Sequence, residues 1–253
     1  MYTILDTICF VMARSAQRPS RRRAAGPVYQ RLLDLIVHGR LGPGARVTES
    51  QAAAELGVSR TPVREAMQRL VRDGLLVPAN GDQGGRTRLV VAPMDADTLI
   101  ELYRLAGALE GLAARGVAAL APAERASLAG RLSAAEAAFR RAAGAQPLDY
   151  DRLFRRHAAV HRTLIDACAG PELRAALEVI RPRVDRFEWY YAPLVGPDLR
   201  MTYREHDAII RAVRRGTSDS VERAMRANWF NGAVRLARAL ARHRTTGLPG
   251  TRE

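Results

Sequence analysis

Two arginines, Arg60 and Arg64, stand four residues apart at the start of a segment that has the signals of a helix. Ser59 and Thr61 carry hydroxyls that can accept an early backbone N–H, and Pro62 is tolerated in a first turn, where N–H groups have no helical partner. Apolar residues recur at spacings of three and four, at Val63, Ala66, Met67, Leu70 and Val71. One face is therefore buried and the arginines lie on the other. Such a helix fits the DNA major groove, where guanidinium groups can meet base edges.

The segment before this helix predicts a shorter one at 51–56. Thr48, followed three residues later by Gln51, has the spacing of a capping box, and Gly57 is a typical stop. Two helices joined by a tight turn form a helix-turn-helix, in which the second helix reads bases and the first crosses the backbone. The same pattern also fits an ordinary two-helix corner with a solvated arginine-rich face.

Two of the five histidines have the spacing of metal ligands. His157 and His161 lie four residues apart in a segment expected to be helical, so both imidazoles share one face. Such pairs are more often exposed or core residues, so the spacing alone leaves both interpretations open. An aromatic cluster could line a cavity nearby, although such a stripe more often belongs to a core: Phe187, Trp189, Tyr190 and Tyr191.

Length, charge and cysteine content limit the class of protein to which these residues can belong. The 253-residue chain can form two hydrophobic cores. Its formal net charge is +14 and all 40 basic residues are arginine, as in proteins from GC-rich genomes, so the charge alone is weak evidence for nucleic acid. Cys9 and Cys168 provide no disulfide framework. The apolar run 4–12 is too short to cross a bilayer and precedes its arginines, unlike a secretory signal. We therefore expect a cytoplasmic protein without a membrane partner.

The element signals divide the chain into two domains with short tails. We expect a disordered leader at 1–25, a winged helix-turn-helix DNA-binding domain at 26–93, an all-α effector-binding and dimerisation domain at 94–245, and a disordered tail at 246–253. Pro27 is predicted to open the first helix. Strands at 75–77 and 88–91 flank a Gly-rich turn and form the wing, with Gly85 and Arg86 at a tip that could enter a minor groove.

From residue 95 onward the strand signals vanish and helix-start residues recur. The expected helices cover 95–120, 122–142, 149–169, a segment from 171 that Pro182 should kink, 199–215 and 218–242. The fold class is therefore mainly α, with an N-terminal winged helix-turn-helix followed by an all-α bundle of about six helices.

Residues 28–77 resemble the DNA-binding domain of the GntR family of bacterial transcription regulators. The matching segments are Ile36…Gly39-Arg40-Leu41-Gly42-Pro43-Gly44, Ala54-Glu55-Leu56-Gly57-Val58-Ser59-Arg60-Thr61-Pro62-Val63-Arg64-Glu65-Ala66 and Arg69-Leu70…Gly74-Leu75. The resemblance implies that the helix from Ser59 enters the major groove and that Arg60 and Arg64 contact bases and phosphates. Ser50 stands at a position that is often basic in the fatty-acid-responsive branch of the family, so this contact should be weaker or absent. The expected DNA-binding set is Arg46, Ser50, Ser59, Arg60, Thr61, Arg64, Gly85 and Arg86.

The second domain resembles the FCD ligand-sensing domain of the FadR-type branch of that family. The landmarks are Leu102-Tyr103…Leu109-Glu110, His161-Arg162-Thr163-Leu164…Ala167…Pro171-Glu172-Leu173, Glu205-His206-Asp207-Ala208-Ile209 and Ala224-Met225-Arg226. In metal-binding members, an Asp and three His hold a divalent ion, often zinc or nickel, beside the ligand. Carried over by position, these ligands fall on His157, His161, His206 and Asn228.

Three departures from the family pattern affect this site. His157 replaces the Asp and Asn228 replaces the last His, leaving three imidazoles and an open position. Asn is a poor ligand, so Asn228 would lower the affinity, or would bond a water or the effector instead. Ala106 stands where an Arg often clamps a carboxylate, so an organic-acid effector must find another cation, or the effector is not a simple carboxylate. The expected effector-pocket residues are Tyr103, Ala106 and Arg183.

Together these features predict a transcription regulator rather than an enzyme. We expect a homodimeric, ligand-responsive repressor that binds a pseudo-palindromic operator, with a small metabolite sensed in the helical domain. The alternative is a zinc-dependent hydrolytic enzyme that uses the three-histidine site, although no carboxylate is clearly placed as its general base. A nucleoid-type architectural protein would need only the basic face and no cavity.

Overall fold

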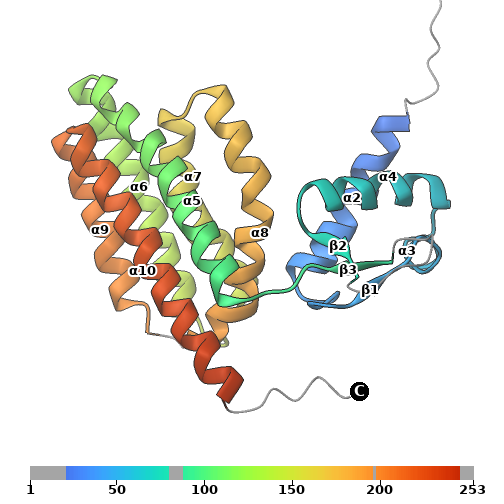
Figure 1. Cartoon of the computed structure of the whole chain (residues 1–253). Coiled ribbons are helices and arrows are strands. Elements are labelled where there is room, and N and C mark those ends of the chain that lie inside the picture. The colour runs from blue at the N-terminus through green and yellow to red at the C-terminus, as the bar shows by residue number, and fades with distance from the viewer. Residues whose placement is uncertain (1–20, 80–87, 196–197, 246–253) are drawn as a thin grey trace, which may run out of the picture.

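The computed structural model describes residues 21–79, 88–195 and 198–245. Over these ranges it shows a small N-terminal domain with a three-stranded sheet beside a bundle of long helices (Figure 1), which confirms the expected fold class. No helix within the described ranges is long and apolar enough to cross a membrane.

The N-terminal domain is a winged helix-turn-helix. Its elements are α2 Arg21–Val37, β1 Arg46–Val47, α3 Glu49–Leu56, α4 Arg60–Arg72, β2 Leu76–Pro78 and β3 Leu89–Val91. Helix α2 begins six residues before Pro27, so the predicted start was wrong: the Arg- and Ala-rich run ahead of Pro27 is itself helix-forming and continues the helix backwards. Residues 1–20 of the expected leader lie outside the described residues.

Local start and stop signals place α4 in its expected position. The hydroxyl of Thr48 accepts the backbone N–H of Gln51, and Gly57 ends α3 with a φ of 66°, a left-handed conformation that glycine adopts without strain. Behind α4, Val63 and Leu70 are fully buried in the domain core. The polar face of α4 is therefore turned outward, as its apolar spacing predicted.

The sheet has the strand order β1-β3-β2 and is antiparallel. Arg46 pairs with Val90 and Leu76 pairs with Val91. The two wing strands were expected, whereas the two-residue β1 was not, because so short a strand carries no periodic signal. The tip between β2 and β3, with Gly85 and Arg86, lies outside the described residues.

The C-terminal domain contains the six α-helices that the sequence predicted. They are α5 Ala96–Ala114, α6 Pro122–Ala143, α7 Tyr150–Cys168, α8 Pro171–Val195, α9 Arg200–Arg215 and α10 Ser218–Thr245. Asp95 and Asp149 cap α5 and α7 by accepting backbone N–H groups at 2.7 and 2.9 Å. The first helix is shorter than expected, because its last turn is the 3₁₀ segment η1 Arg115–Ala119. Helix α8 continues through Pro182.

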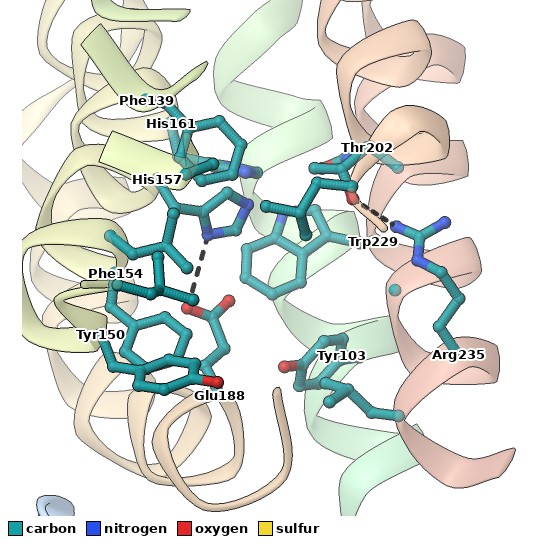
Figure 2. A pocket seen from close by; sticks show the side chains of 17 residues that line it. Tyr103, Phe139, Tyr150, Phe154, His157, His161, Glu188, Thr202, Trp229 and Arg235 are labelled. Carbon is teal, nitrogen blue, oxygen red and sulfur yellow. Dashed lines mark hydrogen bonds and ion pairs between the residues drawn. The ribbon is translucent and has the colours of Figure 1, made fainter. Parts of the chain in front are cut away.

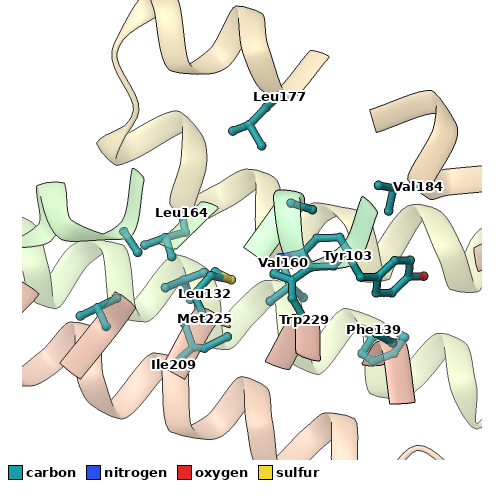
Figure 3. Packing of buried hydrophobic residues seen from close by; sticks show 14 of the residues in the cluster. Tyr103, Leu132, Phe139, Val160, Leu164, Leu177, Val184, Ile209, Met225 and Trp229 are labelled. Atoms are coloured by element: carbon teal, nitrogen blue, oxygen red, sulfur yellow. The ribbon is translucent and has the colours of Figure 1, made fainter. Parts of the chain in front are cut away.

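The bundle core holds the site described below. Leu132, Val160 and Leu164 pack against Ile209 and Met225 from α9 and α10 (Figure 3). Helices α5 and α10 pack along each other, and a Cβ on Gly107 would lie 2.9 Å from the Trp229 Cβ, so only glycine permits this approach. Helix α8 lies on the side of the bundle that faces the N-terminal domain (Figure 1).

Candidate DNA-binding surface and effector site

The first turns of α4 present two exposed guanidinium groups. The Arg60 and Arg64 side chains are 61% and 56% exposed. Both contact Glu49 of α3: Arg64 donates through Nε and Nη2 at 2.8 and 3.0 Å, and Arg60 Nη2 lies 3.5 Å from the same carboxylate. The hydrogen bond from Arg64 lowers the pKa of Glu49. Glu49 was not among the expected site residues, because its partner Arg64 lies fifteen residues away in the sequence.

The other expected DNA contacts in the described ranges also lie on the surface. Arg46 is exposed on β1, Ser50 is exposed on α3, and Ser59 and Thr61 are exposed at the start of α4. Within the described structure the Ser59 hydroxyl makes no capping hydrogen bond, so it is available to a phosphate. All of these residues are therefore exposed to solvent in the described structure.

A cavity of about 110 Å³ lies inside the bundle. Its walls are mostly apolar and aromatic (Figure 2): Tyr103, Phe139, Ala143, Leu148, Tyr150, Leu153, Phe154, His157, His161, Glu188, Leu199, Thr202, Asn228, Trp229, Gly232, Arg235 and Leu236. Apolar walls with a few polar groups are typical of sites that bind small molecules. The Tyr103 hydroxyl is buried and has no hydrogen-bond partner among the described residues. Of the three expected pocket residues, only Tyr103 lines this cavity.

The other two expected pocket residues lie elsewhere. Ala106 is buried in the bundle core, away from the described cavity wall. The guanidinium of Arg183 lies against Gly74, with its Cζ 3.4 Å from where a Cβ on that glycine would stand. Arg183 therefore contacts the DNA-binding domain just beyond the end of α4.

Three histidines converge in the bundle, of which His157 and His161 line the cavity. His157 and His161 come from α7 and His206 from α9, and their ligand atoms all lie within 4.8 Å of one another. His161 and His206 are buried, and within the described structure their Nε2 atoms have no hydrogen-bond partner. Burial lowers the pKa of His206 to about 4, against the opposing effect of Glu136, so this imidazole is neutral at neutral pH. A neutral imidazole with an unpaired ring nitrogen is what a divalent ion requires.

Each of the three imidazoles has a carboxylate beside its Nδ1 atom. His161 donates to Glu110 at 2.7 Å, His206 donates to Glu136 at 2.6 Å, and His157 Nδ1 lies 3.5 Å from Glu188 (the last pair is drawn in Figure 2). Burial raises the pKa of each carboxyl, but the adjacent histidine and a nearby arginine, Arg181 or Arg140, together outweigh burial, so the pKa is lowered. Carboxylates behind the ligating histidines typically fix their tautomer and orientation at metal sites. The three-histidine set therefore fits a divalent ion.

The fourth expected metal position is engaged differently. Asn228 lines the cavity, but its amide nitrogen donates to Glu205 at 3.1 Å. Glu205 also accepts two hydrogen bonds from Arg235, at 2.7 and 2.8 Å. The charge of Arg235, the one arginine in the described cavity wall, is therefore already neutralised.

A winged helix-turn-helix with exposed arginines, joined to a helical domain that contains a mostly apolar cavity, defines the class of two-domain DNA-binding regulators. Comparison with known families agrees with this class. Residues 24–82 match the model for "Bacterial regulatory proteins, gntR family", and residues 101–229 match the FCD domain. The chain belongs to the GntR family of bacterial transcription regulators and carries a C-terminal FCD domain.

Individual relatives give the same result. An uncharacterized HTH-type transcriptional regulator of Mycobacterium tuberculosis is 29% identical over 216 residues, covering 82% of this chain and 83% of the relative. A "Probable D-xylose utilization operon transcriptional repressor" of Paenarthrobacter nicotinovorans is 39% identical over 104 residues, 41% of this chain and 44% of the relative. The structure of E. coli McbR/YncC is similar in fold, with a TM-score of 0.65, 21% identity, and coverage of 86% of this chain and 98% of that one.

The family assignment decides between the alternatives that the sequence left open. The chain is a transcription regulator, so the three-histidine site does not indicate a zinc hydrolase. The matched FCD domain and the cavity within it leave the architectural-protein alternative without support.

Proposed function

We propose that this protein is a ligand-responsive repressor of the FadR-type branch that binds a pseudo-palindromic operator as a homodimer. The observation that carries the proposal is the exposure of Arg60 and Arg64 at the leading end of α4, where a major-groove helix contacts bases. A relative named as an operon repressor supports repression, as opposed to activation, of the target genes. The expected DNA contacts are Arg46, Ser50, Ser59, Arg60, Thr61 and Arg64, with Gly85 and Arg86 of the wing proposed from sequence alone.

The proposed effector is a small metabolite that binds in the bundle cavity beside a divalent ion, zinc or nickel. His157, His161 and His206 would hold the ion, and the unpaired Tyr103 hydroxyl would bond a polar group of the metabolite. A bound divalent ion supplies a positive charge that can accept an oxygen ligand. That charge matters for an organic acid, since Glu205 neutralises Arg235 and no clamping arginine stands at Ala106.

Selection of duplexes from a random-sequence pool tests the proposed function. We expect the protein to enrich inverted repeats, with two half-sites related by a dyad, because a two-fold dimer presents two copies of α4. The selected duplex should bind less tightly as salt concentration rises. Enrichment of single half-sites would contradict the dimer, and the absence of any enriched sequence would contradict the regulator.

The homodimer gives a separate prediction. Leu105 and Leu112, seven residues apart on α5, are 42% and 56% exposed, and Phe230 on the adjoining α10 is 53% exposed. Exposed apolar groups on packed helices often mark a subunit interface. We expect the Leu105→Arg/Leu112→Arg variant to sediment as a monomer in analytical ultracentrifugation. Val179→Arg, which charges a residue 57% exposed on α8, is the control and should remain dimeric. A dimeric double variant would place the interface elsewhere.

Glu49 gives a second prediction, on sequence discrimination. Its carboxylate holds both arginines in the free protein, which limits the directions that their remaining N–H groups can take. An exposed ion pair is worth roughly 0.2–1 kcal/mol, so Glu49→Gln should lower the ratio of specific to non-specific affinity by up to about fivefold. Competition titrations with selected and scrambled duplexes measure this ratio. Glu65→Gln removes the same charge from α4 and should leave the ratio unchanged. An equal effect of both variants would show that only net charge matters.

A further inference from the structure

Helix α8 contacts both domains through neighbouring residues. Glu188 lines the cavity and lies beside His157, and the next residue, Trp189, packs against the hydrophobic core of the DNA-binding domain. One turn earlier, Arg186 donates to the backbone carbonyl of Ala92 at 2.6 Å in a buried contact. A displacement of this part of α8 would therefore change contacts with the cavity and with the DNA-binding domain at the same time.

Aromatic contacts connect the cavity wall to the end of α2. Phe154, which lines the cavity from α7, has its ring centroid 4.9 Å from that of Trp189. On its other side, Trp189 meets the His38 ring edge-on at 4.5 Å. His38 Nδ1 in turn donates to the Asp34 carbonyl in the last turns of α2, at 2.8 Å. Trp189 is thus a single side chain between the cavity wall and the first helix of the other domain.

From α2 the contacts continue to α4. Tyr29 donates to Asp73 at 2.7 Å, immediately after the last residue of α4, and the Arg69 guanidinium lies 3.9 Å above the Tyr29 ring. The two helices also pack directly on each other. A shift of α2 relative to the bundle therefore carries α4 with it. In a dimer, such a shift changes how the two α4 helices are placed relative to each other.

We propose that Trp189 is the coupling residue between cavity and operator: it transmits occupancy of the three-histidine site and its cavity to α2 through Phe154 and Glu188 on one side and His38 on the other. This inference rests on the proposed function. Coupling requires that the ligand favour one of two arrangements. His157, if drawn toward the other two histidines by a bound ion, would change the position of Glu188, and Trp189 would follow as the next residue of α8. Truncating Trp189 should therefore remove the effect of zinc on operator binding while leaving zinc binding and operator binding themselves intact.

Zinc alone is the probe for the test, with two readouts. The first is fluorescence: the chain has two tryptophans, so the zinc response of the wild type minus that of Trp189→Phe reports on Trp189. Zinc should then change the Trp189 emission, although this residue lies outside the histidine set. The second readout is anisotropy with the selected duplex. Coupling between sites typically changes affinity by roughly 5–150-fold, so saturating zinc should change operator affinity by a factor in that range.

The variants separate coupling from binding. In Trp189→Leu, zinc and DNA should each bind as in the wild type, but saturating zinc should change operator affinity by a factor of only about one. Trp189→Phe should restore part of the zinc-induced change. Val179→Ala is the control on the same helix: Val179 is 57% exposed and lies outside the described cavity wall, so saturating zinc should still produce the full change in operator affinity. Thermal melting of each variant verifies the fold.

Two outcomes would overturn the inference, and they differ from failure of the proposed function. A full zinc response in Trp189→Leu would show that the signal takes another route, as would a Trp189 emission that zinc leaves unchanged. A wild-type protein that binds neither zinc nor any selected duplex would overturn the proposed function, and the coupling with it.

Discussion

Replacing Arg60 and Arg64 together by alanine should abolish sequence-specific DNA binding and leave the fold intact. Each bidentate contact between an arginine and a guanine is worth roughly 1–3 kcal/mol, so the double variant should lose roughly 30-fold or more in affinity for the selected duplex. Because both side chains are more than half exposed, stability should change by less than about 1 kcal/mol. Fluorescence anisotropy and urea unfolding measure the two quantities.

The control for this variant must remove the same charge from another place. Arg131→Ala/Arg141→Ala removes two exposed arginines from α6, on the bundle. This pair should weaken binding only slightly and equally for all sequences, because general electrostatic attraction carries no sequence information. An equal loss in both double variants would mean that α4 contributes charge but does not read bases.

The second large effect concerns the metal site. His157→Gln should lower zinc affinity by at least the roughly 10–100-fold that loss of an outer partner causes at other metal sites. Glutamine keeps an N–H that can face Glu188, so the neighbouring carboxylate is not left unpaired. Competition with a fluorescent chelator gives the affinity, and metal analysis after dialysis gives the stoichiometry.

Two further variants show whether this loss is specific. Glu136→Gln leaves all three imidazoles in place but weakens the orientation of His206, so it should cost roughly 10–100-fold. His38→Gln removes a histidine at the domain interface and should leave zinc binding unchanged. If His157→Gln and the wild type bound zinc equally well, the ion would not sit at the three-histidine site.

Local signals explain why so much of the fold could be predicted from the sequence. The start of α4 follows from Ser59 and Pro62, and the starts of α5 and α7 follow from Asp95 and Asp149, whose side chains cap the helices as expected. Each of these signals lies within one turn of the element that it marks. Tertiary contacts have no such marker.

For that reason, the carboxylates that orient the three histidines could not be predicted from the sequence. Glu110 and Glu136 stand 51 and 70 residues from the histidines that they contact, and only the packed bundle brings them together. Glu49 could have been considered, because an acidic residue in the first turn of α3 lies close to the start of α4 in a helix-turn-helix. Arg183 was expected in the cavity, but the side of α8 on which it lies faces the other domain.

The most direct test of the account is a duplex in which the guanines of the selected operator are replaced, one at a time, by 7-deazaguanine. This base still pairs with cytosine but lacks the N7 acceptor that an arginine fork requires. We predict a loss of affinity at one or two positions in each half-site, and no further loss at those positions when Arg60 and Arg64 are already alanine. Unchanged wild-type affinity at every substituted position would contradict the reading of bases by α4.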